Sequence, residues 1–150
     1  MSKYNPPANF AYHNPNVIRA QLPASIAEIA FLHEKLGIRK YYLIDAPVTQ
    51  ILRSAGVARK LQFSQWSRST FCVNMQLFHK LVNEIAAESA KGANVCILGD
   101  YVDVALVCAA LRLHSGWLFV QAIKEMLDNN THKSALSANL DALDAFDKYV

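Results

Sequence analysis

Apolar residues recur along the chain with two alternating patterns, which indicate helices and strands in turn. Spacings of three and four residues, typical of amphipathic helices, occur over residues 25–37, 49–55, 71–92, 103–114 and 117–129, and again at Leu136, Leu140, Leu143 and Phe146. Short apolar runs typical of buried strands lie at 17–18, 41–44, 60–63 and 95–98. The alternation predicts an α/β fold in which helices flank a small, mostly parallel sheet.

Helix-boundary residues support these assignments. Ser25 and Glu28 have the spacing of a capping box, and Gly37, Gly56 and Gly92 each stand where a helix is predicted to end. Residues 1–16 contain three of the five prolines, so we expect an extended N-terminal arm lying over the domain. Residues 1–150 are predicted to form a single domain, a usual size for one core.

The composition indicates where in the cell the protein is located but does not identify a binding partner. The chain is 53% hydrophobic and 18% charged, and its net charge of +3 is too small to indicate nucleic-acid binding. No apolar run approaches the roughly 20 residues of a membrane span. The three cysteines, Cys72, Cys96 and Cys108, lack CxxC spacing and lie in apolar segments, which favours buried thiols and a cytoplasmic location.

Five stretches, read in order, resemble the plant-and-fungal atypical dual-specificity phosphatases. They are PPANFAYHNPNVIRAQLP, FLHEKLGIRKYYLI, SAGVARKLQF, ANVCILGDYVDVALVCAALRLHSGW and AIKEM…DALDAFD. The resemblance covers almost the whole chain. It implies a protein tyrosine phosphatase-like three-layer sandwich.

The resemblance also implies where catalytic residues should lie. Such phosphatases carry the loop His-Cys-x-x-Gly-x-x-Arg-(Ser/Thr)-Gly, in which a thiolate attacks phosphorus while backbone N–H groups and the guanidinium hold the phosphate oxygens. An acid from a second loop protonates the leaving oxygen. Here the second loop should fall near FSQWSRSTF, yet there is no Asp or Glu between Asp45 and Glu84.

The catalytic-loop motif can be aligned with this sequence in two registers, and in neither register does an arginine stand at the arginine position. In an ungapped alignment Ile97 takes the nucleophile position and Asp103 the arginine position. A shift of one residue aligns Cys96 and Gly99 with Cys-x-x-Gly and places Val102 at the arginine position. The catalytic site is therefore predicted to be degenerate.

Asp100 and Asp103, which follow the predicted strand at 95–98, suggest a former phosphate site that is now occupied by the chain's own carboxylates. A helix N-terminus after a strand is a natural anion site. We predict that Asp103 caps this helix near Ala105 or Leu106, and that Asp103, with Asp100, supplies the negative charge that a bound anion would otherwise bring. A metal held by Asp45, Asp100 and Asp103 is the alternative, but capping is the commoner role. His33, His79 and His114 have no ligand spacing, and we expect neither a metal nor a cofactor.

An acid-free stretch provides the candidates for binding. Trp66 and Arg68 lie in a predicted polar loop and have the character of interface anchors. The basic residues of this stretch could receive an acidic partner or an inositol phosphate, although scattered solvated side chains are the simpler interpretation; they are Arg53, Arg59, Lys60, Arg68 and Lys80.

Three functional hypotheses follow. The first is a catalytically inactive phosphatase-like protein, or pseudophosphatase, that acts as an interaction or regulatory subunit, paired with a related phosphatase-like subunit or with itself. The second is a residual phosphatase acting on inositol pyrophosphates or phosphoproteins, as the resemblance implies for active members. The third is an inositol phosphate binder without turnover.

Overall fold

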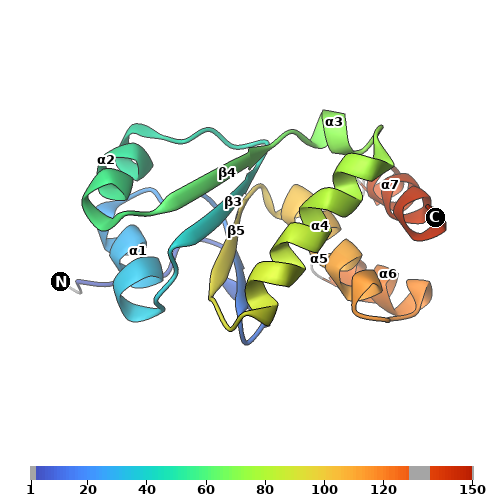
Figure 1. Cartoon of the computed structure of the whole chain (residues 1–150), viewed down its shortest axis with the longest axis horizontal. Helices are drawn as coiled ribbons and strands as arrows, with labels where there is room; N and C mark the ends of the chain where they lie inside the picture. Colours follow the sequence, from blue (N-terminus) through green and yellow to red (C-terminus); the bar gives the residue numbers. More distant parts are fainter. Residues whose placement is uncertain (1–2, 129–135, 150) are drawn as a thin grey trace.

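A five-stranded sheet forms the centre of the molecule (Figure 1). The structure, a computed structural model, describes residues 3–128 and 136–149. The strand order is β1-β2-β5-β3-β4, in which only β1 is antiparallel to its neighbour. The strands are β1 (Ala11–Asn14), β2 (Val17–Ala20), β3 (Lys40–Ile44), β4 (Gln62–Trp66) and β5 (Val95–Gly99). This arrangement confirms the predicted mostly parallel sheet.

Strand alternation divides the apolar side chains between two cores. On one face Tyr41, Leu43 and Cys96 pack beneath α1 (Ile26–Ala30), the π-helical turn η1 (Phe31–Lys35) and α2 (Gln50–Arg59). On the other face Tyr42 and Ile97 pack beneath the remaining helices. These are α3 (Arg68–Phe71), α4 (Met75–Ala90), α5 (Tyr101–His114), α6 (Phe119–Asp128) and α7 (Leu136–Lys148). The result is the predicted three-layer sandwich (Figure 1).

Helix α5 is the most apolar part of the second core. Every residue from Val104 to Leu111 is buried, and α5 packs against α4, α6 and α7. Of the stripe predicted on the last helix, Leu143 and Phe146 are buried in α7 and Leu140 packs partly buried against the same core, while the side chain of Leu136 lies outside the described part of the chain. No helix within the described residues is long and apolar enough to cross a membrane.

The N-terminal arm differs from the prediction. Residues 11–14 are not part of a loose arm, because Ala11 and Tyr12 pair with Arg19 and Ile18 as the edge strand β1. The short predicted strand at 17–18 is therefore one half of a hairpin that turns at residues 15–16, where Asn14 accepts hydrogen bonds from the backbone N–H groups of Asn16 and Val17. Asn14 and Asn16, at the end of the predicted extended arm, are residues of this hairpin turn.

Gly56 does not end α2 as predicted. The helix continues to Arg59, and a Cβ at position 56 would lie only 2.6 Å from the ring of Phe63. This glycine therefore permits close packing of α2 against β4. Lys60 closes the helix in the left-handed region (φ 57°), so β4 spans residues 62–66 rather than 60–63.

The helix predicted over 71–92 begins later than expected, at Met75, and Phe71 belongs to the separate short helix α3. Asn74 begins α4 and accepts a hydrogen bond from the N–H of Leu77 at 3.3 Å, which separates α4 from the short α3. An Asn at a helix start was visible in the sequence, but the apolar spacing that continues through it masked the boundary.

Candidate functional site

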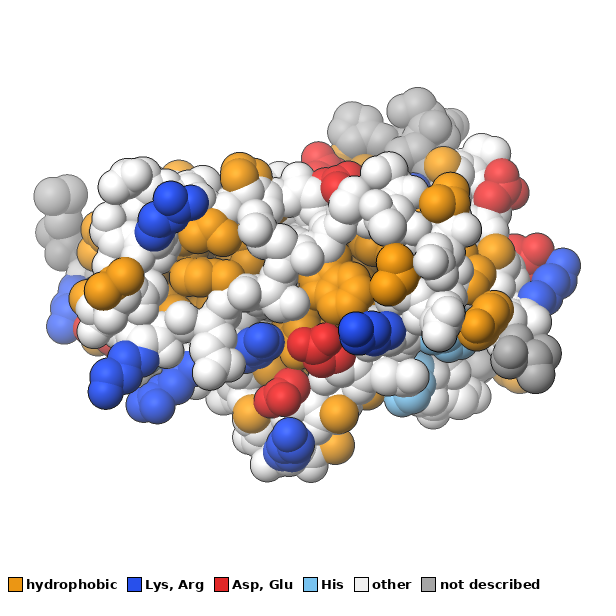
Figure 2. Space-filling view, turned by 45° about the horizontal axis from the view of Figure 1, so that its top comes forward, with side chains coloured by type: hydrophobic (Ala, Val, Ile, Leu, Met, Phe, Trp, Pro, Cys, Tyr) orange, Lys and Arg blue, Asp and Glu red, His pale blue; other side chains and the backbone are white. Residues whose placement is uncertain are grey.

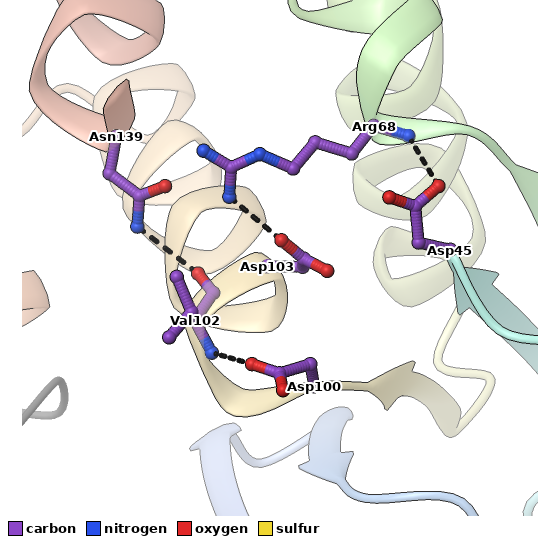
Figure 3. A network of polar contacts seen from close by, with 6 residues as sticks. All are labelled: Asp45, Arg68, Asp100, Val102, Asp103 and Asn139. Carbon is purple, nitrogen blue, oxygen red and sulfur yellow. Dashed lines mark hydrogen bonds and ion pairs between the residues drawn. The ribbon is translucent and has the colours of Figure 1, made fainter. Parts of the chain in front are cut away.

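The carboxyl ends of β3, β4 and β5 meet at one edge of the sheet, because the three strands are parallel. Ligands of open α/β sheets bind at this edge. Here Asp45 follows β3, Arg68 begins α3 after β4, and Asp100 and Asp103 lie at the start of α5 after β5 (Figure 3). The sequence-predicted aspartates are thus brought together around Arg68.

The connection between β5 and α5 is a single residue. β5 ends at Gly99, Asp100 is the N-cap, and α5 begins at Tyr101. Gly99 makes this junction possible, since a Cβ there would lie 2.6 Å from the backbone oxygen of Ile44. The phosphatase motif needs five residues between its cysteine and its arginine to curl around a phosphate. No such loop exists at this junction.

Asp100, not Asp103, caps α5, and the predicted cap was wrong on this point. The Asp100 carboxylate accepts a hydrogen bond from the N–H of Val102 at 2.9 Å (Figure 3). The helix starts two residues earlier than predicted, which places Asp103 inside the first turn. Asp103 still complements the helix dipole from there.

Replacing the cap should have a modest and specific effect. We expect Asp100→Ala to lower the free energy of unfolding by about 1 kcal/mol, and Asp100→Asn to cost less because asparagine also caps helices. Urea denaturation followed by circular dichroism measures both. Asp141→Ala, at an exposed position inside α7, is the matched control. If Asp100→Ala unfolds no more easily than this control, the capping role is refuted.

Asp103 instead pairs with Arg68. The guanidinium donates a hydrogen bond to the carboxylate at 2.8 Å, and the two side chains are only 16% and 17% exposed. The N–H of Arg68 also donates to the carboxylate of Asp45 at 3.0 Å. Arg68 therefore ties the start of α3 to β3 and to α5 (Figure 3).

The electrostatics of this edge disfavour additional negative charge. Burial raises the pKa of Asp103 above its ordinary value, outweighing the hydrogen bond and charge of Arg68, and the charges of Asp45 and Asp100 raise it further. Arg68 thus offsets only part of the effect that burial and the two neighbouring carboxylates have on Asp103. A phosphate dianion at this position would face three aspartates.

Neither candidate for the nucleophile position is accessible. Cys96 and Ile97 are fully buried in the central strand β5, on opposite faces of the sheet. Burial, with a smaller contribution from Cys108, holds the pKa of the Cys96 thiol far above its ordinary value. A reactive cysteine needs exposure and an electropositive setting, and Cys96 has neither.

The remaining residues of the predicted loop have structural positions. Val102 lies in the first turn of α5, where its backbone oxygen accepts a hydrogen bond from the amide of Asn139 at 3.1 Å. Asn139 is fully buried and comes from α7 (Figure 3). This contact fastens the C-terminal helix to the start of α5.

Trp66 is not the exposed loop anchor that the sequence predicted. It is the last residue of β4 and is partly buried against the larger of the two cores, the one that contains Tyr42 and Ile97. Its indole N–H donates a hydrogen bond to the hydroxyl of Ser64 at 2.8 Å. Arg68 is likewise committed to Asp103. The signal was misread because Trp66 follows polar residues that alternate along a strand rather than forming a loop.

The other basic candidates lie away from this edge. Arg59 ends α2 and Lys60 is exposed at its C-cap, near the amino end of β4. They therefore share no site with Arg68, which follows the carboxyl end of β4.

Two shallow hollows lie along the strand ends, with Asp45, Ala46 and Pro47 in both. One, of about 450 Å³, is completed by Gln65, Trp66 and Ser67. The other, of about 310 Å³, is completed by Gln21, Leu22, Gly99 and Asp100. Within the described residues no group of three or more His, Cys, Asp or Glu side chains is placed to hold a metal ion.

The fold is that of protein tyrosine phosphatase-like proteins. The chain is similar to the core catalytic domain of the PP-IP phosphatase SIW14 from S. cerevisiae (16% identity, TM-score 0.74, 91% of this chain and 86% of that chain). It is also similar to P. aeruginosa TpbA (17%, 0.71, 93% and 89%) and to PTPMT1 in complex with PI(5)P (14%, 0.65, 91% and 96%). No protein-family model and no curated protein matches the sequence.

Sequence reasoning missed one residue of this site, Asn139, and the pairing of Arg68 with Asp103. The Arg68–Asp103 pair joins residues 35 positions apart, and Asn139 reaches Val102 across 37 positions. Periodicity reports only which face of an element is apolar, so it gives no signal for such pairs. The lack of acids around Arg68 was the one hint that its counter-ion lies elsewhere in the chain.

Proposed function

We propose that this protein is a pseudophosphatase, a phosphatase-like protein without turnover that acts in the cytoplasm as an interaction or regulatory subunit. The observation that carries the proposal is the one-residue connection between β5 and α5. A phosphatase of this fold needs a loop there to cradle the phosphate and present the thiolate. A chain that keeps the fold without this loop can bind partners through its surface but cannot hold a phosphate for attack.

The charge of the strand edge supports the same proposal. Asp100 accepts the hydrogen bond of a helix N–H group that a phosphate would use, and Asp103 occupies the only guanidinium among the residues drawn in Figure 3. Similarity to structures of phosphatases supports a shared fold, and a shared fold does not imply a shared reaction. We expect the partner to be a related phosphatase-like subunit or a second copy of this chain, or another protein.

Titration with inorganic anions tests the loss of the phosphate site. With sulfate, phosphate or orthovanadate, we expect the backbone N–H resonances of residues 99–104 to show no saturating shift below about 1 mM anion. The reason is that a dianion would face Asp45, Asp100 and Asp103. Two-dimensional ¹⁵N–¹H spectra make the measurement, with chloride at equal ionic strength as the control. A saturating shift confined to these residues would instead favour a non-hydrolysing phosphate or inositol phosphate binder.

A further inference from the structure

One edge of the sheet is open for pairing. Within the described residues 3–128 and 136–149, β4 has β3 on one side only and is the last strand in the order. The N–H of Gln62 bonds to Arg39, and the backbone oxygen of Trp66 accepts from Asp45, so alternate residues of β4 face β3. Phe63 and Gln65 therefore direct their N–H and C=O groups outward. Outside the strand ladder, no backbone hydrogen bond of the described residues involves either of them.

This edge lacks the features that usually block strand addition. β4 reads QFSQW and contains no charged residue and no proline. Edge strands commonly carry lysines, prolines or bulges that prevent another chain from pairing. A neutral, regular edge strand is suited to accept an extended peptide through main-chain hydrogen bonds.

An apolar hollow of about 230 Å³ lies beside the open edge. Its walls come from α2, β4 and the segments that lead into them: Val48, Arg53, Gly56, Val57, Leu61 and Phe63. Val57 is 82% exposed, which is unusual for a valine. The hollow can receive one apolar side chain of a peptide paired with β4.

The charge around this edge is positive. Arg53 lines the hollow, Lys60 is exposed at the end of α2, and no Asp or Glu occurs between Asp45 and Glu84. Arg39 lies at the amino end of β4, where its backbone oxygen accepts a hydrogen bond from the N–H of Gln62 at 2.8 Å. The pKa of His33 is lowered mainly by burial and further by the charges of Arg39 and Arg59, so both guanidinium groups act on this part of the surface. In the left part of Figure 2, over α2 and β4, hydrophobic side chains lie open between Lys and Arg side chains.

We propose that the free edge of β4 and the hollow beside Val57 dock an acidic, extended peptide segment of a partner protein. The segment adds to the sheet as a sixth strand, bonds to the outward groups of Phe63 and Gln65, and inserts one apolar side chain against Val57. Its acidic residues face the basic side chains around this edge, Arg53 in the hollow, Arg59 and Lys60 at the end of α2, and Arg39 opposite the start of β4. The inference rests on the proposed function, in which a fold without turnover acts by binding.

The probe is a peptide selected on the purified full-length protein from a library of random short peptides. We expect the selected sequences to combine acidic residues with a central apolar residue. When one of them is synthesised and bound, amide exchange at Phe63 and Gln65 should slow by about tenfold or more, since these groups enter a ladder. A library that gives no binder, or a binder that leaves both amides unprotected, overturns the proposal.

Two variants and a matched control locate the binding. Val57→Glu places a negative charge in the hollow, and Gln65→Pro removes an outward N–H that the native ladder does not use. Each should weaken the selected peptide by about tenfold or more in fluorescence polarisation. Val73→Glu changes a valine that is equally exposed, at 85%, outside the hollow and should leave affinity unchanged. Equal losses in all three variants, or none, contradict the proposal.

Two further readouts separate the alternatives. Sedimentation tests self-association through this edge: we expect Gln65→Pro to leave the oligomeric state unchanged, and a dimer that Gln65→Pro abolishes would assign the edge to a second copy and overturn the peptide proposal. Phosphatase turnover is measured on the same samples. If the peptide binds and the protein also shows turnover, the proposed function is contradicted and the docking edge stands. If the peptide does not bind and there is no turnover, only the docking edge is contradicted.

Discussion

Asp103→Arg is expected to lower the free energy of unfolding by about 3 kcal/mol and to give no phosphatase turnover. The substitution places an arginine where the ungapped family alignment has one. In the folded protein, however, it removes the carboxylate bound to Arg68 and sets a second guanidinium beside it in a site where both side chains are mostly buried. Restoring this one motif residue therefore damages the protein and cannot create a phosphate loop.

A charge swap provides the control for Asp103→Arg. In the double variant Arg68→Asp/Asp103→Arg the pair can form in the opposite direction, so we expect more than half of the lost stability to return. Urea denaturation of the two single variants and the double variant gives the coupling energy. If Asp103→Arg is as stable as the unmodified protein, the buried pair has no structural role. If it turns over an aryl phosphate, the site is far less degenerate than proposed.

Gly99→Ala is expected to cost about 3 kcal/mol, the upper part of the range for overpacking. The added Cβ would lie 2.6 Å from the backbone oxygen of Ile44, and that atom cannot rotate away as a side chain could. Because Gly99 is buried where β5 meets α5, the strain falls on the short junction itself. Thermal and urea denaturation measure the loss.

Gly92→Ala separates this clash from ordinary backbone strain. Gly92 also has a positive φ (85°), but a Cβ there meets nothing within 4 Å. We expect it to cost about 1 kcal/mol, the strain of an alanine in the left-handed region. Equal costs at the two glycines would show that β5 and β3 separate easily and that the junction is not tightly fixed.

The sequence predicted the layers of this fold better than its boundaries. Apolar periodicity depends on which residues face the cores, and it placed β3, β5, α5 and α7 within a few residues. It did not reveal β1, because four residues with one buried side chain carry too little pattern. Gly56 was interpreted as the end of a helix. A glycine is needed there because the ring of Phe63 packs against α2, and such a tertiary contact leaves no signal in the local sequence.

The site was predictable in composition but not in geometry. The motif positions of the sequence lack the arginine and the acid, and the structure places Asp100 and Asp103 together at the start of α5. The cap was assigned to Asp103 instead of Asp100, because it depends on whether α5 begins at residue 101 or 103 and periodicity leaves such boundaries open by a few residues. Trp66 and Arg68 were read as free anchors because their partners, the larger core and Asp103, are distant in sequence.

Turnover is the measurement that tests the central claim most directly. Purified protein is assayed with an aryl phosphate and with an inositol pyrophosphate, beside its Cys96→Ser and Cys72→Ser variants; Cys72 is half-buried and lies outside the predicted catalytic loop. We expect the unmodified protein to give no signal above that of Cys96→Ser. Its turnover number should stay below about 0.01 per second, whereas a median enzyme turns over about 10 times per second. A faster rate that Cys96→Ser abolishes and Cys72→Ser preserves would contradict the account.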